Sequence, residues 1–531
     1  MRIVGIEGTA WAASAALYDT ETDEVVIESD PYQPDSGGIH PREAAEHMGT
    51  AIPDVVATVL DQAAETAGGD GLDVDAVAFS RGPGLGPCLR IVGTAARALA
   101  QTLSVPLVGV NHMVAHLEIG RHQSGFDSPV CLNASGANAH LLGYHNGRYR
   151  ILGETMDTGV GNAIDKFTRH LDWSHPGGPK VEQRAKDGDY YDLPYVVKGM
   201  DFSFSGIMSA AKDAVDDGVP VEDVCAGLQE TIFGMLTEVA ERALSLTGTD
   251  ELVLGGGVGQ NARLRAMLAS MCEQRGADFY APEPRFLRDN AGMIAVLGAK
   301  MYAAGDTLDV ADSSVDPNFR PDEVPVTWRG EGESVVRDPS ASGTIRGAEA
   351  TVTFEDDRVI KRRVPKAYRH PALDERLRAE RTRAEARLTS AARRVGVPTP
   401  VVYDIDPQDG TLVFEYVGHD DLAAALTVDR CRAVGRHLAA IHDAGFVHGD
   451  PTTRNVRVGE ERTYLVDFGL GYHTGHVEDH AMDLHVFKQS VAGTAAESAP
   501  LLDAFEAGYA AAGDAEVRTR LRAIEGRGRY Q

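Results

Sequence analysis

Two aspartates and an asparagine near the C-terminal end constrain the fold of this chain most tightly. Asp450 is followed five positions later by Asn455, and Asp467-Phe468-Gly469 comes one strand and turn further on. In phosphoryl transfer, an aspartate in this position contacts the acceptor, while the asparagine and the second aspartate hold metal ions against the phosphates. The three side chains must converge on one triphosphate. The spacing therefore predicts a compact phosphotransferase domain.

Residues upstream of these motifs fit the same chemistry. Lys361 lies on a predicted strand after the turn at 347–350, where kinases place a phosphate-binding lysine, and Glu385 (less favourably Glu380) is its expected ion-pair partner. The glycine-rich loop is short, His448-Gly449-Asp450 lacks the usual arginine, and no Ala-Pro-Glu follows the DFG. We expect an ATPase or an atypical Ser/Thr kinase that uses ATP with Mg²⁺. Its predicted catalytic residues are Asp450 and Lys361, and its predicted ATP and Mg²⁺ site comprises Gly347, Lys361, Glu385, Asn455 and Asp467.

The chain is too long for this domain alone. It has 531 residues, so several folding units are expected. Residues 321–344 are rich in Pro, Gly, Ser and charge and have no periodicity, as linkers do. We predict a first domain at 1–325, a linker at 326–342 and a small α+β bilobal kinase-like domain at 343–531.

Composition narrows the class of protein. The net charge is −28, which is typical of proteins that stay hydrated in a salt-rich cytosol, or of an ordinary acidic protein. The five cysteines form no CxxC pair, which argues against a disulfide framework or a cysteine zinc site. No run of 18 apolar residues occurs, so we expect a cytoplasmic protein without a membrane partner.

Strands and helices alternate twice in the first domain. Residues 1–110 are predicted to form three strands, a helix, a strand and a helix, and a similar order follows residue 128. Two such halves facing each other across a cleft form the α/β actin-like, sugar-kinase ATPase fold. We predict that fold, with duplicated subdomains, for residues 1–325.

Two histidines suggest a metal site in the first domain. His112 and His116 are four positions apart, so on a helix both imidazoles face one side and can share a metal. Met113 stands where a zinc protease would have its glutamate. Asp289, which precedes a predicted helix, could add an oxygen ligand from the other side of the cleft.

Glycine-rich turns next to predicted strands and helices suggest a nucleotide. Gly255-Gly256-Gly257 ends a strand and leads to Asn261 at a helix start, where backbone can approach a nucleotide closely. Segment 153–169 offers Asp165 and Lys166, and segment 175–182 offers Gly178 and Glu182. Each motif alone is an ordinary turn, but together with the two histidines they predict a metal-assisted nucleotide site.

The motifs IEGTA, SRGPGLGPCLR, NHMVAH, GETMDTGVGNAIDKFTR, DFSFSG, LGGGVGQN and RDNAGMIA resemble the universal tRNA threonylcarbamoyltransferase family, the catalytic subunit of KEOPS and a relative of bacterial TsaD. The resemblance covers about 1–322. It implies transfer of threonylcarbamoyl from threonylcarbamoyl-AMP to N6 of the adenosine 3′ of the anticodon in ANN-decoding tRNAs. It also implies iron or zinc bound by His112, His116 and Asp289; archaeal relatives commonly add a tyrosine where this chain has Asn133. The implied acyl-adenylate site comprises Asn133, Ser135, Gly136, Asp165, Lys166, Gly178, Glu182, Gly256 and Asn261.

The second domain resembles the small atypical kinase of KEOPS in VHGDPTTRN, DFGLG, EDHAMDLHVF and RGRGRYQ, across 343–531. This resemblance implies a small dimerising subunit on the first domain and a further KEOPS subunit on the kinase. Residues 358–394 hold 13 basic and 4 acidic side chains and form a candidate tRNA contact, although a solvated helix has the same pattern. The candidate tRNA contacts are Arg376, Arg378, Arg381, Arg383, Arg527 and Arg529.

Three other readings remain open from the motifs alone. A metalloprotease fits the two histidines but not Met113. A signalling kinase with a scaffold as its first domain fits the phosphotransferase motifs but leaves the glycine motifs without a role. A binding protein with two inactive sites would not need Asp450, Asn455 and Asp467 in their catalytic spacing.

Overall fold

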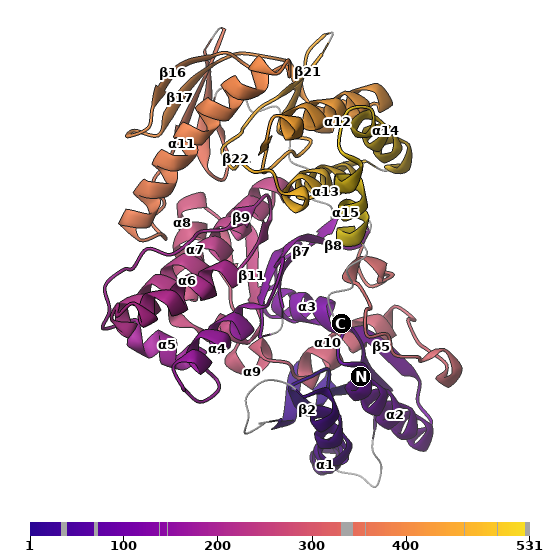
Figure 1. Cartoon of the computed structure of the whole chain (residues 1–531). Coiled ribbons are helices and arrows are strands. Elements are labelled where there is room, and N and C mark those ends of the chain that lie inside the picture. Colours follow the sequence, from indigo (N-terminus) through magenta and orange to yellow (C-terminus); the bar gives the residue numbers. More distant parts are fainter. Residues whose placement is uncertain are drawn as a thin grey trace. The chain divides into compact units, whose positions relative to one another are not determined.

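The computed structural model describes residues 1–32, 40–67, 73–136, 138–145, 147–330, 344–355, 357–460, 462–495 and 497–525. The chain divides into two compact units, whose elements are labelled in Figure 1. The first unit comprises 1–195 and 202–337, and the second comprises 338–527 with the segment 196–201. The main boundary lies within the predicted linker.

The first half of the first unit is a five-stranded sheet in the order β3-β2-β1-β4-β5. β2 and β3 continue antiparallel from β1, and β4 and β5 run parallel to it. Neighbouring residues of β1 point to opposite faces: Val4 packs towards α1 and α2, and Ile3 packs towards α3 and α10. The bounds are β1 (Arg2–Glu7), β2 (Ala12–Asp19), β3 (Glu24–Pro31), α1 (Pro41–Ala67), β4 (Ala76–Gly82), α2 (Gly86–Leu103), β5 (Leu107–Asn111), α3 (His112–Ser124) and α10 (Ala291–Ala303).

The second half repeats this topology. Its sheet has the order β12-β11-β6-β7-β8, in which β7 and β8 continue antiparallel from β6 while β11 and β12 run parallel. Read from β8, this is the same 3-2-1-4-5 order as in the first sheet. The duplication predicted from the element order is therefore confirmed. The bounds are β6 (Val130–Ala134), β7 (Ala139–His145), β8 (Arg148–Glu154), β11 (Glu251–Gly255) and β12 (Asp278–Tyr280).

Helices of the second half follow β8 and β11. α7 is 27 residues long and mostly buried, and its buried residues include Glu238 and Glu241 as well as apolar side chains. The bounds are α4 (Val160–His170), α5 (Gly178–Arg184), α6 (Ser205–Asp216), α7 (Val221–Thr247), η1 (Gly257–Gln260), α8 (Ala262–Arg275), α9 (Pro284–Leu287), η2 (Val310–Asp312) and η3 (Pro321–Glu323). The two-residue strands β9 (Val197–Lys198) and β10 (Asp201–Phe202) pair with each other, and β9 lies in the segment that belongs to the second unit.

Residues after η3 pack on the first unit. Trp328 stacks on Tyr149, and the Arg329 guanidinium lies 3.8 Å from the centre of the Tyr144 ring. The Arg329 side chain is fully buried with Glu118, which also pairs with Lys300. The linker predicted from 326 therefore begins later, because an arginine of that segment completes a buried ion network.

The second unit begins with an antiparallel sheet in the order β13-β14-β15-β17-β16, next to the long helix α11. The turn at 347–350 joins β13 to β14 and is closed by the Gly347 N–H, which donates to the Ala350 carbonyl over 2.8 Å. The bounds are β13 (Thr344–Arg346), β14 (Ala350–Glu355), β15 (Arg358–Arg363), α11 (Pro371–Arg394), β16 (Val402–Asp406) and β17 (Thr411–Glu415).

The remainder of the second unit is mainly helical, with short strands around its functional loops. α12 packs closely on α14, where Gly435 and Gly508 let the two backbones approach. The bounds are β18 (Asp420–Asp421), η4 (Leu422–Ala424), α12 (Val428–Asp443), β19 (Phe446–Val447), β20 (Val456–Val458), β21 (Thr463–Leu465), β22 (Tyr472–His473), α13 (Val477–Thr494), α14 (Ala499–Ala510) and α15 (Ala515–Glu525).

Among the described helices, none combines the length and the hydropathy that a membrane span needs.

Candidate active sites

A cluster of two imidazoles and a carboxylate forms at the start of α3. The Asn111 side chain accepts hydrogen bonds from Met113 N and Val114 N over 3.0 and 3.1 Å, which starts the helix at His112. His116 follows one turn later, and Asp289 arrives just before α10. Nε2 of each histidine lies 3.4 Å from Asp289 Oδ1. The structure thus brings together the three predicted ligands, which we call the metal-site trio.

The trio has the geometry that a cation needs. Ligand atoms at about 2.1 Å from a tetrahedral zinc ion lie about 3.4 Å from one another, and each histidine Nε2 lies at that distance from Asp289 Oδ1. No other His, Cys, Asp or Glu of the described residues joins the three within the 4.8 Å that separates their ligand atoms. Two nitrogens and one oxygen with an open fourth position is the donor set of catalytic rather than structural zinc sites.

Glu7, which was not predicted from the sequence, contacts His112 on the side of the ring away from Asp289. Its side chain is fully buried at the end of β1, and Oε2 lies 3.2 Å from His112 Nδ1 and also accepts from the Ser80 hydroxyl. Oε1 accepts from the Thr9 N–H over 2.8 Å. Burial disfavours a charged imidazole, but the carboxylates of Glu7 and Asp289 outweigh it and raise the pKa of His112 to about 10. The contact with Glu7 favours a proton on Nδ1, and Nε2 on the other side of the ring faces Asp289.

The trio opens into a cavity of about 1270 Å³ between the two halves of the first unit. Most of the predicted acyl-adenylate residues line it, while Lys166 is exposed and, like Gly256, lies outside the lining. Gly256 has a φ of +85°, and a Cβ there would lie 2.3 Å from the Ala134 carbonyl oxygen, so the position requires glycine. The predicted residues in the lining are His112, Asn133, Ser135, Gly136, Asp165, Gly178, Glu182, Asn261 and Asp289.

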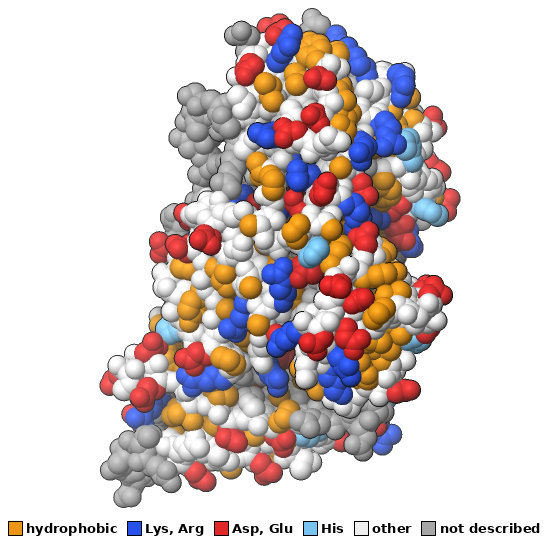
Figure 2. Space-filling model, turned by 90° about the vertical axis from the view of Figure 1, so that its left-hand side faces the viewer, with side chains coloured by type: hydrophobic (Ala, Val, Ile, Leu, Met, Phe, Trp, Pro, Cys, Tyr) orange, Lys and Arg blue, Asp and Glu red, His pale blue; other side chains and the backbone are white. Residues whose placement is uncertain are grey.

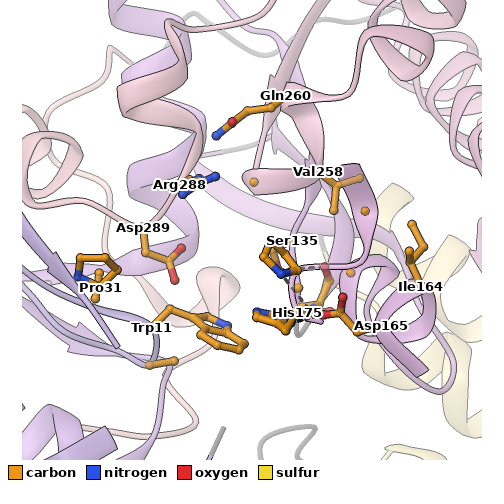
Figure 3. Close-up of a pocket in the computed structure, with 18 of the residues that line it drawn as sticks. Trp11, Pro31, Ser135, Ile164, Asp165, His175, Val258, Gln260, Arg288 and Asp289 are labelled. Atoms are coloured by element: carbon orange, nitrogen blue, oxygen red, sulfur yellow. Dashed lines mark hydrogen bonds and ion pairs between the residues drawn. The ribbon is translucent and has the colours of Figure 1, made fainter. Parts of the chain in front are cut away.

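An aromatic pair lies at this cavity. The rings of Trp11 and His175 are stacked, with centres 5.2 Å apart, and Figure 3 shows Asp165 beside them. Asp165 binds this loop twice, through His175 Nδ1 at 3.1 Å and the Gly177 N–H at 2.8 Å. Trp11 and His175 were not predicted, because contacts between residues so far apart in sequence leave no periodic signal.

Two further predicted residues have local structural roles. Asn261 caps α8, since its side-chain oxygen accepts from the N–H groups of Arg263 and Leu264. Glu182 accepts from the Ala262 N–H over 2.9 Å. Both side chains therefore fix the start of α8 at the edge of the cavity, and their predicted contact with a ribose stays a prediction.

In the second unit, the predicted ion pair of Lys361 and Glu385 lies next to Asp467, the aspartate of the DFG motif. Lys361 Nζ lies 2.9 and 3.0 Å from the two oxygens of Glu385 and 2.7 Å from Asp467 Oδ1. Arg363, which was not predicted, contacts Glu385 over 2.6 Å. Burial would raise the pKa of Asp467, but Lys361 and Arg363 hold it well below its usual range. The carboxylate is therefore charged at neutral pH, as a metal ligand must be.

Asp450 and Asn455 also meet as predicted. Asn455 Nδ2 donates to the Asp450 carbonyl over 2.8 Å and to Oδ2 over 3.0 Å. Asp483 of α13 accepts from the N–H groups of His448 and Gly449 over 2.7 and 2.9 Å, which fixes the loop before Asp450. Asp483 is buried and was not predicted, since only the fold brings α13 beneath this loop.

Ion pairs restrain three of the six arginines proposed for tRNA contact. Arg381 is buried against Glu349 at 2.7 Å, Arg378 contacts Asp374 at 2.8 Å, and Arg376 lies 3.5 Å from Glu380. Arg383 is exposed, and Arg527 and Arg529 lie outside the described residues. On the face drawn in Figure 2, basic side chains lie among acidic ones rather than in one band. α11 is therefore a weaker basic surface than its composition suggests.

Two duplicated α/β halves around a large cavity are typical of actin-like nucleotide-binding folds. The sequence matches the model of the TsaD family, described as tRNA N6-adenosine threonylcarbamoyltransferase, over residues 21–296, and the chain belongs to this family. The predicted family is thereby confirmed, and the chain is a tRNA-modifying protein.

Relatives match both units. Proteins named probable bifunctional tRNA threonylcarbamoyladenosine biosynthesis protein are 74% identical in Haloquadratum walsbyi, over 100% of both chains, and 73% identical in Halobacterium salinarum, over 100% of this chain and 99% of the relative. A protein of the same name in Methanospirillum hungatei is 52% identical over 99% of each chain. The fusion of two units is thus shared over the full length.

Proposed function

We propose that the first unit transfers the threonylcarbamoyl group of threonylcarbamoyl-AMP to N6 of the adenosine 3′ of the anticodon in ANN-decoding tRNAs. The observation that carries this proposal is the metal-site trio, open on one side, at a cavity large enough for an acyl-adenylate. Family membership supports the same reaction.

The transfer needs no covalent intermediate. The adenosine amine attacks the carbamoyl carbon and forms the N–C bond; the bond from that carbon to the phosphate oxygen breaks, AMP leaves with its electron pair, and one amine proton passes to phosphate or water. All five cysteines are buried, and burial raises the pKa of Cys131 near the trio to about 12, so none is suited to nucleophilic attack. The protein's contribution is orientation and exclusion of water.

The trio fits a divalent metal, iron or zinc, held by Nε2 of both histidines and Asp289. Such an ion would supply Lewis-acid charge that orients and polarises oxygens of the acyl donor. Glu7 would keep His112 in the tautomer that binds it. Asp165, His175 and the backbone near Gly256 shape the rest of the cavity around the nucleotide.

The test uses the whole chain in molar KCl with threonylcarbamoyl-AMP, unmodified tRNA and, if needed, the other KEOPS subunits. Nucleosides are analysed by mass spectrometry for wild type, His116→Ala and the control His122→Ala, which lies on the same helix outside the cavity. We expect threonylcarbamoyladenosine from wild type and the control only. Modification that survives His116→Ala would refute the role of the trio, and no modification by wild type would refute the transfer.

We further propose that the second unit is an atypical kinase or ATPase that supports the transfer, with ATP and Mg²⁺ at Lys361, Asn455 and Asp467 and with Asp450 at the acceptor. The contacts of Lys361 with Glu385 and Asp467 support this assignment. They hold the lysine ammonium and the Asp467 carboxylate close together, as binding of one triphosphate with its metal ion requires. Asp450→Ala should abolish ATP hydrolysis and autophosphorylation, while Asp443→Ala, at the exposed end of α12, should not. Equal loss in both variants would contradict the assignment.

The proposal includes the partners that the resemblance implies. A small dimerising KEOPS subunit would bind the first unit, and a further subunit would bind the second. Copurification of either subunit with the chain, tested by size-exclusion chromatography in molar KCl, checks this.

A further inference from the structure

Two buried polar side chains at the cavity have unpaired atoms. Asn133 on β6 and His140 on β7 are register partners, so their side chains are neighbours on one face of the sheet. They are only 4% and 1% exposed, and both line the cavity. Within the described part of the chain, Asn133 Oδ1 and both ring nitrogens of His140 have no hydrogen-bond partner.

Folding alone does not explain this pair. Each buried polar group without a partner destabilises the folded protein, and apolar side chains would fill the same space without that cost. Glu7, also beside the trio, uses both carboxylate oxygens, whereas His116 Nδ1 is a further buried atom without a partner among the described residues. Unpaired buried groups at the wall of a cavity are expected where a ligand completes their hydrogen bonds.

The pair suits an uncharged polar group. His140 is almost fully buried, and burial disfavours the charged form of an imidazole, so the neutral ring is the favoured form here. A neutral imidazole has one N–H donor and one nitrogen acceptor, and the Asn133 oxygen adds a second acceptor. A hydroxyl can accept from the His140 N–H and donate to Asn133 Oδ1, which pairs two of the three unpaired atoms.

We propose that Asn133 and His140 bind the side-chain hydroxyl of the threonyl part of the acyl donor, and thereby select a hydroxylated amino acid over an apolar one of the same shape. This inference rests on the proposed threonylcarbamoyl transfer and names a specificity subsite within it. Valine is the informative competitor, because a methyl group replaces the hydroxyl with little change of volume. A site built to bond a hydroxyl rejects such an analogue by about 10⁴-fold.

The test compares kcat/KM for the carbamoyl-adenylates of threonine and valine, with unmodified tRNA as acceptor. We expect wild type to prefer the threonine compound by about 10⁴-fold, and His140→Phe to reduce that preference at least about 100-fold. His145→Phe is the matched control, since it makes the same change on the same strand outside the cavity lining. His140→Gln, which keeps a donor and an acceptor, should retain more of the preference than Phe.

Two other readouts separate this role from a structural one. His140→Phe removes unpaired buried atoms, so the melting temperature of the free protein should stay equal or rise, and zinc affinity in chelator competition should not change. If His140→Phe does not fold, Asn133→Val provides the same comparison.

Wild-type transfer of both compounds at similar rates, or an unchanged preference in His140→Phe, would overturn this inference and leave the transfer standing. No transfer of either compound by wild type would instead refute the proposed function.

Discussion

Replacing Glu7 by glutamine tests how the trio is prepared for its metal. The carboxylate accepts three hydrogen bonds, from Thr9 N–H, the Ser80 hydroxyl and His112 Nδ1. Glutamine has nearly the same shape but only one acceptor oxygen. If its NH₂ faces His112, the imidazole must accept at Nδ1 and carry its proton on Nε2, where the metal binds. If its NH₂ faces Thr9, two N–H groups oppose each other in a fully buried place.

Either orientation weakens the site. Loss of a carboxylate that orients a metal-bound histidine typically lowers metal affinity by about 10–100-fold, which is about 1.4–2.8 kcal/mol. The zinc dissociation constant of the full chain in molar KCl, measured by chelator competition, should rise by that factor. Ser80→Ala is the control, because it removes one donor to Glu7 and leaves the contact with His112. Zinc affinities equal to wild type in a folded Glu7→Gln protein would refute the reasoning.

Three further predictions concern other parts of the chain. Burial alone would raise the pKa of Glu118, but Lys300 and Arg121 lower it from 4.5 to about 2. The charged Glu118 should therefore stabilise the fold by about 3 kcal/mol above pH 4.5, and this contribution should disappear as the pH falls to 2. In urea unfolding, Glu118→Gln should lose less stability than wild type between pH 5 and 3. Gly256→Ala should abolish tRNA modification, since φ is +85° and the new Cβ would overlap the Ala134 carbonyl, whereas full activity would contradict that contact. Lys361→Met should reduce ATP turnover at least about 100-fold without affecting zinc affinity, and an equal effect on both sites would argue against two separate centres.

Local sequence patterns predicted much of the fold and the trio. The two repeats were visible because short strands and longer helices have different hydrophobic periods, and their equal order implied the duplication. His112 and His116 were predictable because four positions on a helix bring side chains to one face. Lys361, Asn455 and Asp467 were recognisable because phosphoryl transfer fixes their order along the chain.

Groups that meet only through the tertiary fold were missed. Glu7 and His112 are on separate segments that become neighbours through the parallel strands β1, β4 and β5. His140 faces Asn133 only because of the register of β6 and β7, and a shift by one residue would send it to the other face. Arg329 resembled part of a linker, since the sequence does not reveal that it pairs with Glu118 beside Arg121 and Lys300. Composition likewise overstated α11, where acidic side chains pair with the basic ones.

The chain has a net charge of −28, but the charged groups at the centre of its two candidate sites are buried. At molar salt the Debye length is about 3 Å, so surface charges steer a polyanion such as tRNA very little. Buried groups are screened far less, and the decisive ones are buried: Glu7 and His116 in the first unit, Lys361 and Glu385 in the second. At molar salt, the interactions between charged groups inside both sites therefore stay strong, while the long-range attraction between surface charges and tRNA is screened. In the transfer proposed above, recognition of tRNA at such salt would then depend on shape and on stacking of the anticodon-loop base, and the stacked rings of Trp11 and His175 at the cavity offer an aromatic surface for it.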